Sequence, residues 1–256
     1  MGYASSVAPL GMWSMRELSG SLKKRAVVVH SGGMDSSICL AQAIQDFGRE
    51  NVLGLTFSYQ QRHSSEIKQA RLICDRWQVD HVEIDLSCLT QITENSLTRH
   101  SLPIEAKPGE PPNSLVLGRN GLMARLAAIH ADSLGAQVIY MGVIEVESAN
   151  SGYRDCSRLY MDKMEEILRM DLADSSFEIR TPLVFMTKRE TLGCAHRLGI
   201  LEFLLEETIT CYEGIPKKGC GHCPACQLRN EGVAEFLSEH PEIQFSYRGE
   251  FVGSKV

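Results

Sequence analysis

The C-terminal part of the chain carries four cysteines whose spacing is typical of a metal site: Cys211, Cys220, Cys223 and Cys226. Four thiolates with glycine and proline turns between them match a closed tetrahedral zinc site, which has no open position for water and therefore stabilises the fold. Disulfides and a C-x-x-C redox pair are the alternatives. His222 lies between the ligands and could replace one of them. We predict one structural zinc ion bound by the four cysteines.

A second group of residues suited to chemistry is the run Ser31-Gly-Gly-Met-Asp-Ser36. The β-branched run at residues 26–30 predicts a buried strand before it, and the apolar spacing after it predicts a helix. A glycine turn between a strand and a helix directs backbone N–H groups and the positive end of the helix dipole toward an anion. The run lacks the residues that complete the P-loop, the dinucleotide-binding motif and the serine-hydrolase elbow. It therefore predicts a phosphate-binding loop of another kind.

Asp35 within this run has a simple structural explanation as a helix N-cap. A carboxylate does not attract phosphate, so a functional Asp35 would act through Mg²⁺. The loop as a whole resembles the S-G-G-x-D-S loop of the PP-loop ATP pyrophosphatases. Proteins of that group release pyrophosphate from ATP and activate a carbonyl or carboxyl group as an adenylate.

Between these two ends, strands and helices alternate along the chain. The predicted strands span residues 26–30, 51–57, 81–86, 137–142 and 177–183, and the predicted helices after the first one span 64–77, 120–134 and 187–198. This alternation predicts a doubly wound, mostly parallel α/β sheet of Rossmann-like type, with ligands beyond the carboxyl ends of the strands. Four prolines in residues 98–118 exclude a helix there and predict an active-site loop or lid.

Length and charge set further bounds on the protein. The 256 residues are enough for one large α/β domain with an appendage, and the net charge of −6 argues against a surface that broadly coats nucleic acid. We expect residues 1–24 to form a poorly ordered lead-in rather than a signal peptide, 25–200 the ATP-binding domain, and 201–256 a zinc-binding helical region packed on it. Nine cysteines and no apolar run of about 18 residues favour a reducing, cytoplasmic location without a membrane span.

Polar side chains follow the predicted strands at the points where they end. They are Arg62, His63, Arg119, Asn120, Tyr153, Asp155 and Lys188. Each has an ordinary explanation as a solvated charge, a helix cap or a packed ring. Because the carboxyl ends of parallel strands meet at one edge of the sheet, their convergence favours a binding site.

Several motifs together identify a family. They are the Ser-Gly-Gly-x-Asp-Ser loop, Tyr59-x-Gln61-Arg62-His63, Gly118-Arg119-Asn120, Ser151-Gly152-Tyr153-x-Asp155-Cys156, Thr181-Pro182-Leu183, and Thr210-Cys211-Tyr212 followed by the cysteine cluster. From about residue 25 to about residue 237 the chain resembles the 7-cyano-7-deazaguanine synthases. That family converts 7-carboxy-7-deazaguanine and ammonia to the 7-cyano base with ATP, through an adenylated carboxylate and an adenylated amide, on the pathway to queuosine.

The resemblance implies roles for particular residues. ATP contacts are expected from His30, Ser31, Gly32, Gly33, Met34, Asp35, Ser36, Ser37, Ile38, Cys39 and Leu40. Catalytic roles are expected for Asp35, Arg62, Arg119 and Lys188, the last three as charges that neutralise phosphate or carboxylate. Contacts with the guanine-like base are expected from His63, Asn120, Tyr153 and Asp155. The expected cofactors are ATP, Mg²⁺ and one Zn²⁺, the expected partners are small molecules, and family members often form dimers.

The chain also departs from the family pattern around Tyr153. The usual G-V-C-E-T-D-F-S-G-Y-P-D-C-R is replaced by a longer loop that lacks T-D-F and carries Arg154 and Ser157 in place of proline and arginine, and Leu117 replaces a proline. One alternative is therefore a relative that transfers the activated deazapurine carboxylate to another acceptor, such as a protein amine. Another is a tRNA-binding PP-loop protein that uses the cysteine cluster as a nucleic-acid module, although the acidic balance argues against it.

Overall fold

The computed structural model describes residues 24–59, 65–93, 115–146, 153–245 and 248–252. Its centre is a five-stranded parallel sheet in the order β3-β2-β1-β4-β5. The strands are β1 (Ala26–Val29), β2 (Val52–Ser58), β3 (Asp80–Asp85), β4 (Val138–Met141) and β5 (Glu178–Arg180). Every strand predicted from the sequence is present. The fifth is shorter than predicted because the chain turns at Thr181-Pro182, and proline lacks the N–H that would continue the ladder.

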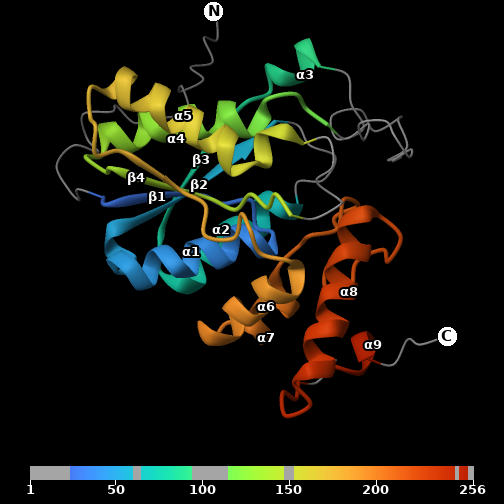
Figure 1. Cartoon of the computed structure of the whole chain (residues 1–256). Helices are drawn as coiled ribbons and strands as arrows, with labels where there is room; N and C mark the ends of the chain where they lie inside the picture. Colours follow the sequence, from blue (N-terminus) through green and yellow to red (C-terminus); the bar gives the residue numbers. More distant parts are fainter. Residues whose placement is uncertain (1–23, 60–64, 94–114, 147–152, 246–247, 253–256) are drawn as a thin grey trace, which may run out of the picture.

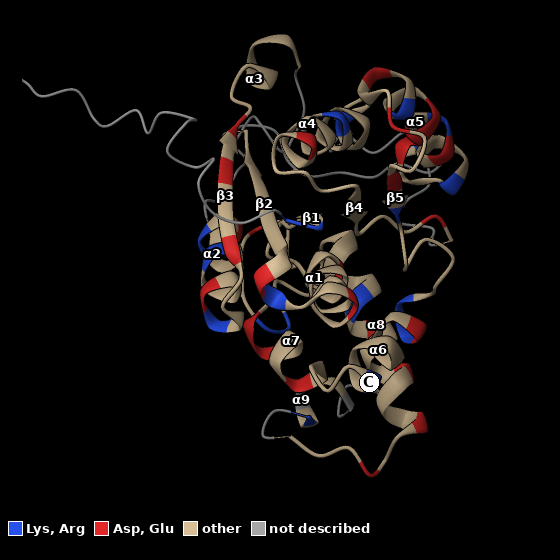
Figure 2. Ribbon diagram, turned by 90° about the vertical axis from the view of Figure 1, so that its left-hand side faces the viewer, with Lys and Arg blue, Asp and Glu red and all other residues tan. Residues whose placement is uncertain are grey.

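Helices cover both faces of the sheet, as Figures 1 and 2 show from two sides. One face carries α4 (Arg119–Ser133) and α5 (Arg158–Leu172), which pack in one hydrophobic cluster with the residues of that face. The other face carries α1 (Met34–Phe47), α2 (Ser65–Trp77), α6 (Lys188–Arg197), α7 (Leu201–Glu207) and α8 (Pro224–Glu239). The short elements are η2 (Arg49–Asn51), α3 (Leu89–Ile92), η4 (Arg154–Cys156) and α9 (Gly249–Val252). The doubly wound fold predicted from the sequence is confirmed.

The C-terminal helices share a core with the sheet domain. Leu192 of α6, Leu204 of α7 and Phe236 of α8 belong to the same buried cluster as Ile38 of α1. The domain boundary predicted at residue 200 stays a prediction, and residues 1–23 and most of the proline-rich segment 98–118 lie outside the described residues. Helix α5 was not predicted, although Met161, Leu168 and other apolar residues give it a buried face.

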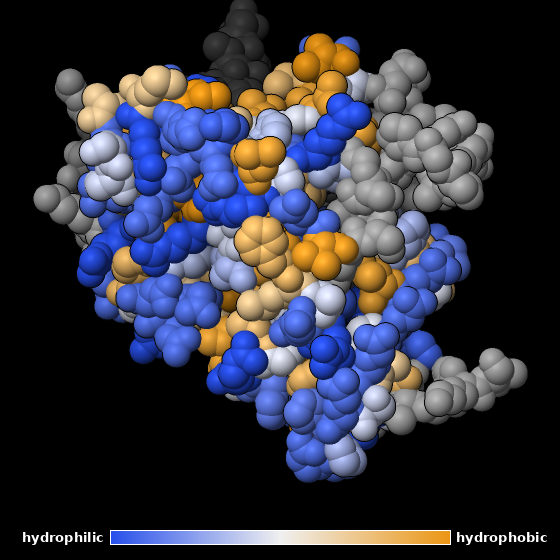
Figure 3. All heavy atoms as spheres, in the orientation of Figure 1, coloured by the Kyte–Doolittle hydropathy of each residue, from blue (hydrophilic) through white to orange (hydrophobic). Residues whose placement is uncertain are grey.

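The described surface is mostly polar and carries both signs of charge. Figure 2 shows Lys and Arg interspersed with Asp and Glu on helices such as α2 and α5, and Figure 3 shows apolar residues reaching one face in small groups. Among the described residues, no helix is long and apolar enough to cross a membrane. The surface charge pattern therefore does not identify a partner. A binding site is expected instead at the carboxyl edge of the sheet.

The loop between β1 and α1 comes very close to the backbone of its neighbours. Gly32 has a φ of 80°, and a Cβ added there would lie 2.4 Å from the backbone oxygen of Glu66 and 2.8 Å from the backbone nitrogen of Ala70 in α2. A Cβ on Gly142, just after β4, would lie 2.9 Å from the backbone nitrogen of Ser36. Glycine at these two positions lets the loop sit between α2 and the end of β4.

We predict that Gly32→Ala lowers the free energy of unfolding by about 2–4 kcal/mol, because the new Cβ meets both an unfavourable φ and the backbone of α2. Gly33→Ala is the matched control, since Gly33 has an extended backbone and its added Cβ would make ordinary contacts at 3.4 Å and 3.6 Å. That control should change stability by less than about 1 kcal/mol. Urea unfolding of the two variants measures the difference, and equal effects would contradict the packing argument.

Candidate functional site

A cavity of about 340 Å³ lies at the carboxyl ends of β1, β2 and β4. Of the residues predicted from the sequence, those that line it are His30, Ser31, Gly33, Met34, Asp35, Ser36, Arg119, Asn120, Tyr153 and Lys188. They come from segments that are far apart in the sequence. The fold therefore brings the loop at the start of α1 and the polar residues after the other strands into one site. Arg62 and His63 lie outside the described residues.

One end of the cavity is the phosphate-binding loop at the start of α1. The Ser36 hydroxyl oxygen accepts a hydrogen bond from the Ser31 backbone nitrogen at 3.1 Å and lies 3.1 Å from the Gly33 carbonyl oxygen, to which it donates. No side chain caps this helix start, and Met34, Asp35 and Ser36 of its first turn line the cavity, so backbone N–H groups without intrahelical partners lie at the cavity wall. With the positive end of the helix dipole, they form a site suited to an anion such as phosphate.

A lysine and an aspartate pair at this end. The Lys188 Nζ lies 2.8 Å and 2.9 Å from the two carboxylate oxygens of Asp35. Lys188 begins α6, where Thr187 and Glu190 form a reciprocal capping box that fixes the helix start. Its stem passes along α8 at Gly232, where an added Cβ would lie 2.7 Å from the Lys188 side chain. The side chain is 5 % exposed, so its charge is directed toward Asp35 and the cavity.

The other end of the cavity consists of an arginine among tyrosines. Arg119 Nη1 donates to the Tyr59 hydroxyl at 3.1 Å, and the guanidinium lies 5.7 Å from the centre of the Tyr59 ring. The hydroxyl of Tyr59, followed by those of Tyr153 and Tyr212, raises the pKa of Arg119 against the opposing effect of burial. A planar, permanently charged group among aromatic rings is suited to a flat ligand that carries a carboxylate.

Asp155 does not line the cavity but lies buried behind this end. Its Oδ2 accepts a hydrogen bond at 2.9 Å from the backbone nitrogen of Asn120, in the first turn of α4. The Asn120 side chain donates in turn to Cys156 Sγ at 3.3 Å. The Asp155 carboxylate therefore fixes the start of the helix that carries Arg119.

The remaining predicted loop residues form the support beneath the loop. Ile38, Cys39 and Leu40 are fully buried in the hydrophobic core, and neither they nor Gly32 and Ser37 line the cavity. His30 Nε2 lies 3.0 Å from the Ser37 hydroxyl, and burial lowers the pKa of His30 to about 3, with His81 adding to the shift. The neutral His30 ring therefore joins the end of β1 to α1.

Glu66 and Tyr212 are among the cavity residues that were not predicted as site residues. Glu66, in the first turn of α2, is half-buried because it faces the cavity, and burial raises its pKa to about 7 while the positive charge of Arg119 opposes the shift. Tyr212 lies beside the first cysteine of the cluster, and burial raises its pKa. Helical spacing in the sequence could have pointed to Glu66, because it lies four residues before Ala70, which is on the buried apolar face of α2.

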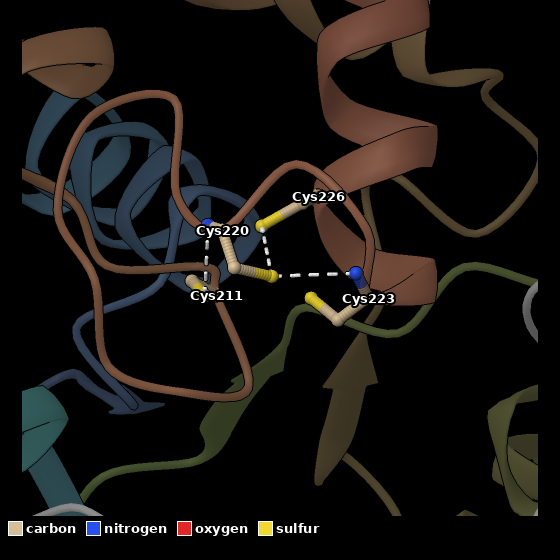
Figure 4. Close-up of side chains that lie close together, drawn as sticks. All are labelled: Cys211, Cys220, Cys223 and Cys226. Carbon is tan, nitrogen blue, oxygen red and sulfur yellow. Dashed lines mark hydrogen bonds between the residues drawn. The ribbon is translucent and has the colours of Figure 1, made fainter. Parts of the chain in front are cut away.

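The four predicted cysteines form one cluster beside the cavity. Figure 4 shows their sulfur atoms converging between the loop ahead of α8 and its first turn. All four sulfurs lie within 4.8 Å of one another, and those of Cys220 and Cys226 are 3.9 Å apart. Zinc–sulfur bonds of about 2.3 Å in a tetrahedron separate sulfurs by about 3.8 Å, whereas a disulfide needs about 2.05 Å. The cluster thus has the composition and spacing to hold a metal such as zinc.

Backbone groups and glycines support this cluster. The backbone nitrogens of Glu213 and Cys220 each donate to Cys211 Sγ at 3.4 Å. Gly219 has a φ of 70°, and a Cβ there would lie 2.3 Å from Cys226 Sγ. The exposed His222 instead pairs with Glu213, its Nε2 lying 2.9 Å from the carboxylate. The four thiols therefore offer a complete donor set, and His222 with Glu213 and Cys220 forms a second, more exposed group of possible ligands.

A parallel sheet with an anion-binding loop after its first strand, a cavity at its carboxyl edge and a four-cysteine cluster define an α/β protein with a PP-loop type of site. Residues 25–237, most of the chain, match the family model described as queuosine biosynthesis protein QueC. The chain belongs to this family, which confirms the resemblance to the 7-cyano-7-deazaguanine synthases. Membership supports an ATP-using enzyme of queuosine biosynthesis.

Solved structures with a similar arrangement share few residues with this chain. An NH3-dependent NAD synthetase from Campylobacter jejuni is 14% identical, with 89% of this chain and 80% of that chain covered and a TM-score of 0.44. The U34-tRNA thiolase NcsA from Methanococcus maripaludis, with its 4Fe-4S cluster, is 15% identical, with 89% and 71% covered and a TM-score of 0.45. A 4-thiouridine synthetase in complex with RNA and ATP is 19% identical, with 90% and 54% covered and a TM-score of 0.47. Likeness at this level assigns neither ligand nor activity to the present chain.

We predict that Cys223→Ser reduces zinc content and lowers the free energy of unfolding by about 3 kcal/mol or more, because a closed thiolate site contributes folding energy. For a chain of this size the unfolding midpoint should fall by about 6–12 °C. Cys88→Ser, at an exposed cysteine outside the cluster, is the control and should leave both values unchanged. Metal analysis and thermal unfolding check the prediction, and a Cys223→Ser protein with full zinc content and stability would contradict it.

Proposed function

We propose that the protein converts 7-carboxy-7-deazaguanine and ammonia to 7-cyano-7-deazaguanine with ATP. The observation that carries the proposal is the single cavity that joins a phosphate-binding loop at one end to the Arg119 and tyrosine cluster at the other. An enzyme that adenylates a carboxylate must hold a nucleotide phosphate next to that carboxylate. The family match supports the same reaction class.

The loop end is suited to binding ATP. The backbone N–H groups at the start of α1 and the Ser31 hydroxyl would contact the phosphates, and Lys188 adds a positive charge at the cavity wall. Asp35 would hold Mg²⁺, which supplies further compensation of phosphate charge when bound. Opposite charges on Lys188 and Asp35 keep both side chains in place before the nucleotide binds.

The other end is suited to the base. Arg119 would bind the carboxylate through two parallel hydrogen bonds, and Tyr153, which also lines the cavity, offers a ring on which a planar base could stack. Asp155 positions this end by fixing the start of α4. Asn120 and, outside the described residues, His63 and Arg62 complete the proposed set.

The zinc site has a structural part in this proposal. Thr210 and Tyr212, on either side of Cys211, line the cavity, and so do Ala225 and Leu228 around Cys226. A bound zinc ion would hold these two segments together, so the metal fixes one wall of the cavity without touching the substrate. The cytoplasmic location and the homodimer expected from the resemblance stay predictions.

A second candidate reaction uses the same activated base but another acceptor, such as a protein amine. The altered loop between Glu145 and Ser157 favours it, because this loop departs from the family pattern next to Tyr153. In this case the adenylate would form as before, and ammonia would not complete the reaction.

We predict that the purified chain with ATP, ammonium and 7-carboxy-7-deazaguanine yields the nitrile with two molecules of AMP and two of pyrophosphate per nitrile, because carboxylate and amide are each adenylated. Mass spectrometry of the base and chromatography of the nucleotides measure this. Asp35→Asn, which keeps the size of the side chain but removes its charge, should lose most AMP formation. AMP without nitrile at high ammonium would favour the second candidate, and no pyrophosphate from this base would contradict both.

A further inference from the structure

The Glu66 carboxylate lines the cavity but has no role in the reaction proposed above. Among the described residues, it and Asp35 are the only acidic side chains that line the cavity. Asp35 is paired with Lys188, whereas the Glu66 carboxylate has no hydrogen bond or ion pair within the described part of the chain. A half-buried carboxylate has lost part of its hydration, so its place in the cavity calls for a functional explanation.

The position of Glu66 is fixed by both ends of the cavity. Its backbone lies directly against the phosphate-binding loop, since a Cβ on Gly32 would come within 2.4 Å of the Glu66 carbonyl oxygen. Its side chain interacts electrostatically with Arg119, at the end assigned to the substrate carboxylate. The raised pKa described above also suits a group that accepts and releases a proton near neutral pH.

We propose that Glu66 is the catalytic residue that removes protons from the acceptor amine and later from the amide nitrogen. The inference rests on the proposed function, because it presupposes an adenylate in this cavity. Glu66 would then make all the proton transfers that the reaction requires. The phosphate-binding loop has no group that accepts a proton, and Arg119 keeps its positive charge and cannot accept one.

The first half of the reaction forms the amide. Ammonium transfers one proton to the Glu66 carboxylate, and the nitrogen lone pair of the resulting ammonia attacks the acyl carbon. The C–N bond forms, the bond from carbon to the phosphate oxygen breaks, and AMP leaves with that electron pair. Glu66 returns its first proton to water in the cavity and accepts the second from the nitrogen, which leaves the neutral amide.

In the second half, the amide oxygen displaces pyrophosphate from another ATP and forms a bond to the α-phosphorus. The nitrogen then loses one proton to Glu66, which gives a neutral adenylated imidate. After Glu66 has released that proton, it accepts the remaining N–H proton while the carbon–oxygen bond breaks. AMP leaves, and the electrons of the N–H bond complete the nitrile triple bond.

The test separates adenylation from amine transfer in a Glu66→Gln variant. With ATP and 7-carboxy-7-deazaguanine alone, the variant should release pyrophosphate in a single turnover at a rate within about threefold of wild type. With ammonium, its formation of amide and nitrile should fall about 10²- to 10⁴-fold, the usual contribution of a general base. Hydroxylamine is largely unprotonated near neutral pH, so the variant should still convert the adenylate to the hydroxamate.

Two further variants complete the experiment. Glu66→Asp keeps a carboxylate and should retain more nitrile formation than Glu66→Gln, which also tests the inference if the glutamine variant does not fold. Glu206→Gln, at an exposed position of α7, is the matched control and should behave as wild type.

Three results would overturn the inference. They are unchanged nitrile formation in Glu66→Gln, loss of pyrophosphate release in that variant, and equal loss of amide and hydroxamate. Wild-type protein that releases no pyrophosphate from this base would instead overturn the proposed function, and the assignment of Glu66 with it.

A buried arginine of α8 lies close to the cysteine cluster. Arg229, in α8, is 2 % exposed, and its Nε and Nη2 lie 3.2 Å and 3.1 Å from the side-chain oxygen of Asn230. Within the described residues it has no carboxylate partner. Arg229 follows Cys226 by three residues in α8, and both are buried, so their side chains lie on the same side of the helix. A buried cation with no acid beside it needs another negative charge.

We propose that Arg229 is a positioning residue that balances the charge of the metal–thiolate centre. Zinc bound to four thiolates has a net charge of about −2, and the guanidinium compensates part of it in a place that water does not reach. The arginine is thus favourable in the metal-bound protein and unfavourable in the metal-free protein. The effect on stability of a residue that only fills space would be the same in the metal-bound and the metal-free protein.

Arg229→Met removes the charge and keeps most of the volume, and Arg229→Lys keeps the charge. Competition with a chromophoric chelator on the full chain should show zinc bound about 10- to 100-fold more weakly by the methionine variant, and within about threefold of wild type by the lysine variant. Metal-free Arg229→Met should unfold at the same or a higher temperature than metal-free wild type, whereas the zinc-loaded variant should unfold at a lower one. Wild-type zinc affinity in Arg229→Met, or an equal loss of stability in both states, would overturn the assignment.

Discussion

The close approach of backbone segments around the loop at the end of β1 is the constraint on which the site depends. Gly32 lies against the first turn of α2, and Gly142 brings the end of β4 against the start of α1. The backbone nitrogen of Ile209 donates to the Gly32 carbonyl at 3.2 Å. The loop is therefore bound on its other side to the segment that runs into Cys211. Because three neighbours meet at one loop, the anion site, Glu66 and the start of the cysteine cluster have fixed relative positions.

This constraint explains why the four-cysteine cluster lies so near the loop after β1. From Ile209 to Cys211 only one residue intervenes, so a metal at the cluster fixes the segment that also contacts the phosphate-binding loop. Lys188 gives a second link, since α8 begins at the cluster and its Gly232 makes room for the lysine stem. A metal held by the cluster would therefore act on the cavity through backbone position, and its own chemistry would not be needed there.

The sequence predicted those parts of the site whose spacing is local. The four cysteines and the loop after β1 each lie within a short segment, and local turn chemistry is sufficient to recognise them. Glu66 could not be recognised in this way, because its role depends on where α2 packs against the loop. Asp155 illustrates a further reason, since a sequence does not distinguish a carboxylate that faces a ligand from one that accepts a backbone N–H. The parallel sheet was predictable because buried strands and amphipathic helices alternate, whereas α5 follows a polar segment that conceals its start.

The departure from the family pattern after Tyr153 acquires a physical meaning in the structure. Ser157, which replaces an arginine, is the N-cap of α5, and its hydroxyl accepts a hydrogen bond from the Tyr160 backbone nitrogen at 3.2 Å. The backbone nitrogen of Arg158 donates to Glu145 at 2.9 Å, so the two ends of the altered loop are joined. Asp155 meanwhile keeps its hydrogen bond to α4. Within the described residues, the altered loop therefore caps the start of α5 and leaves the hydrogen bond from Asp155 to α4 intact. This favours retention of carboxylate activation, whichever amine accepts the activated group.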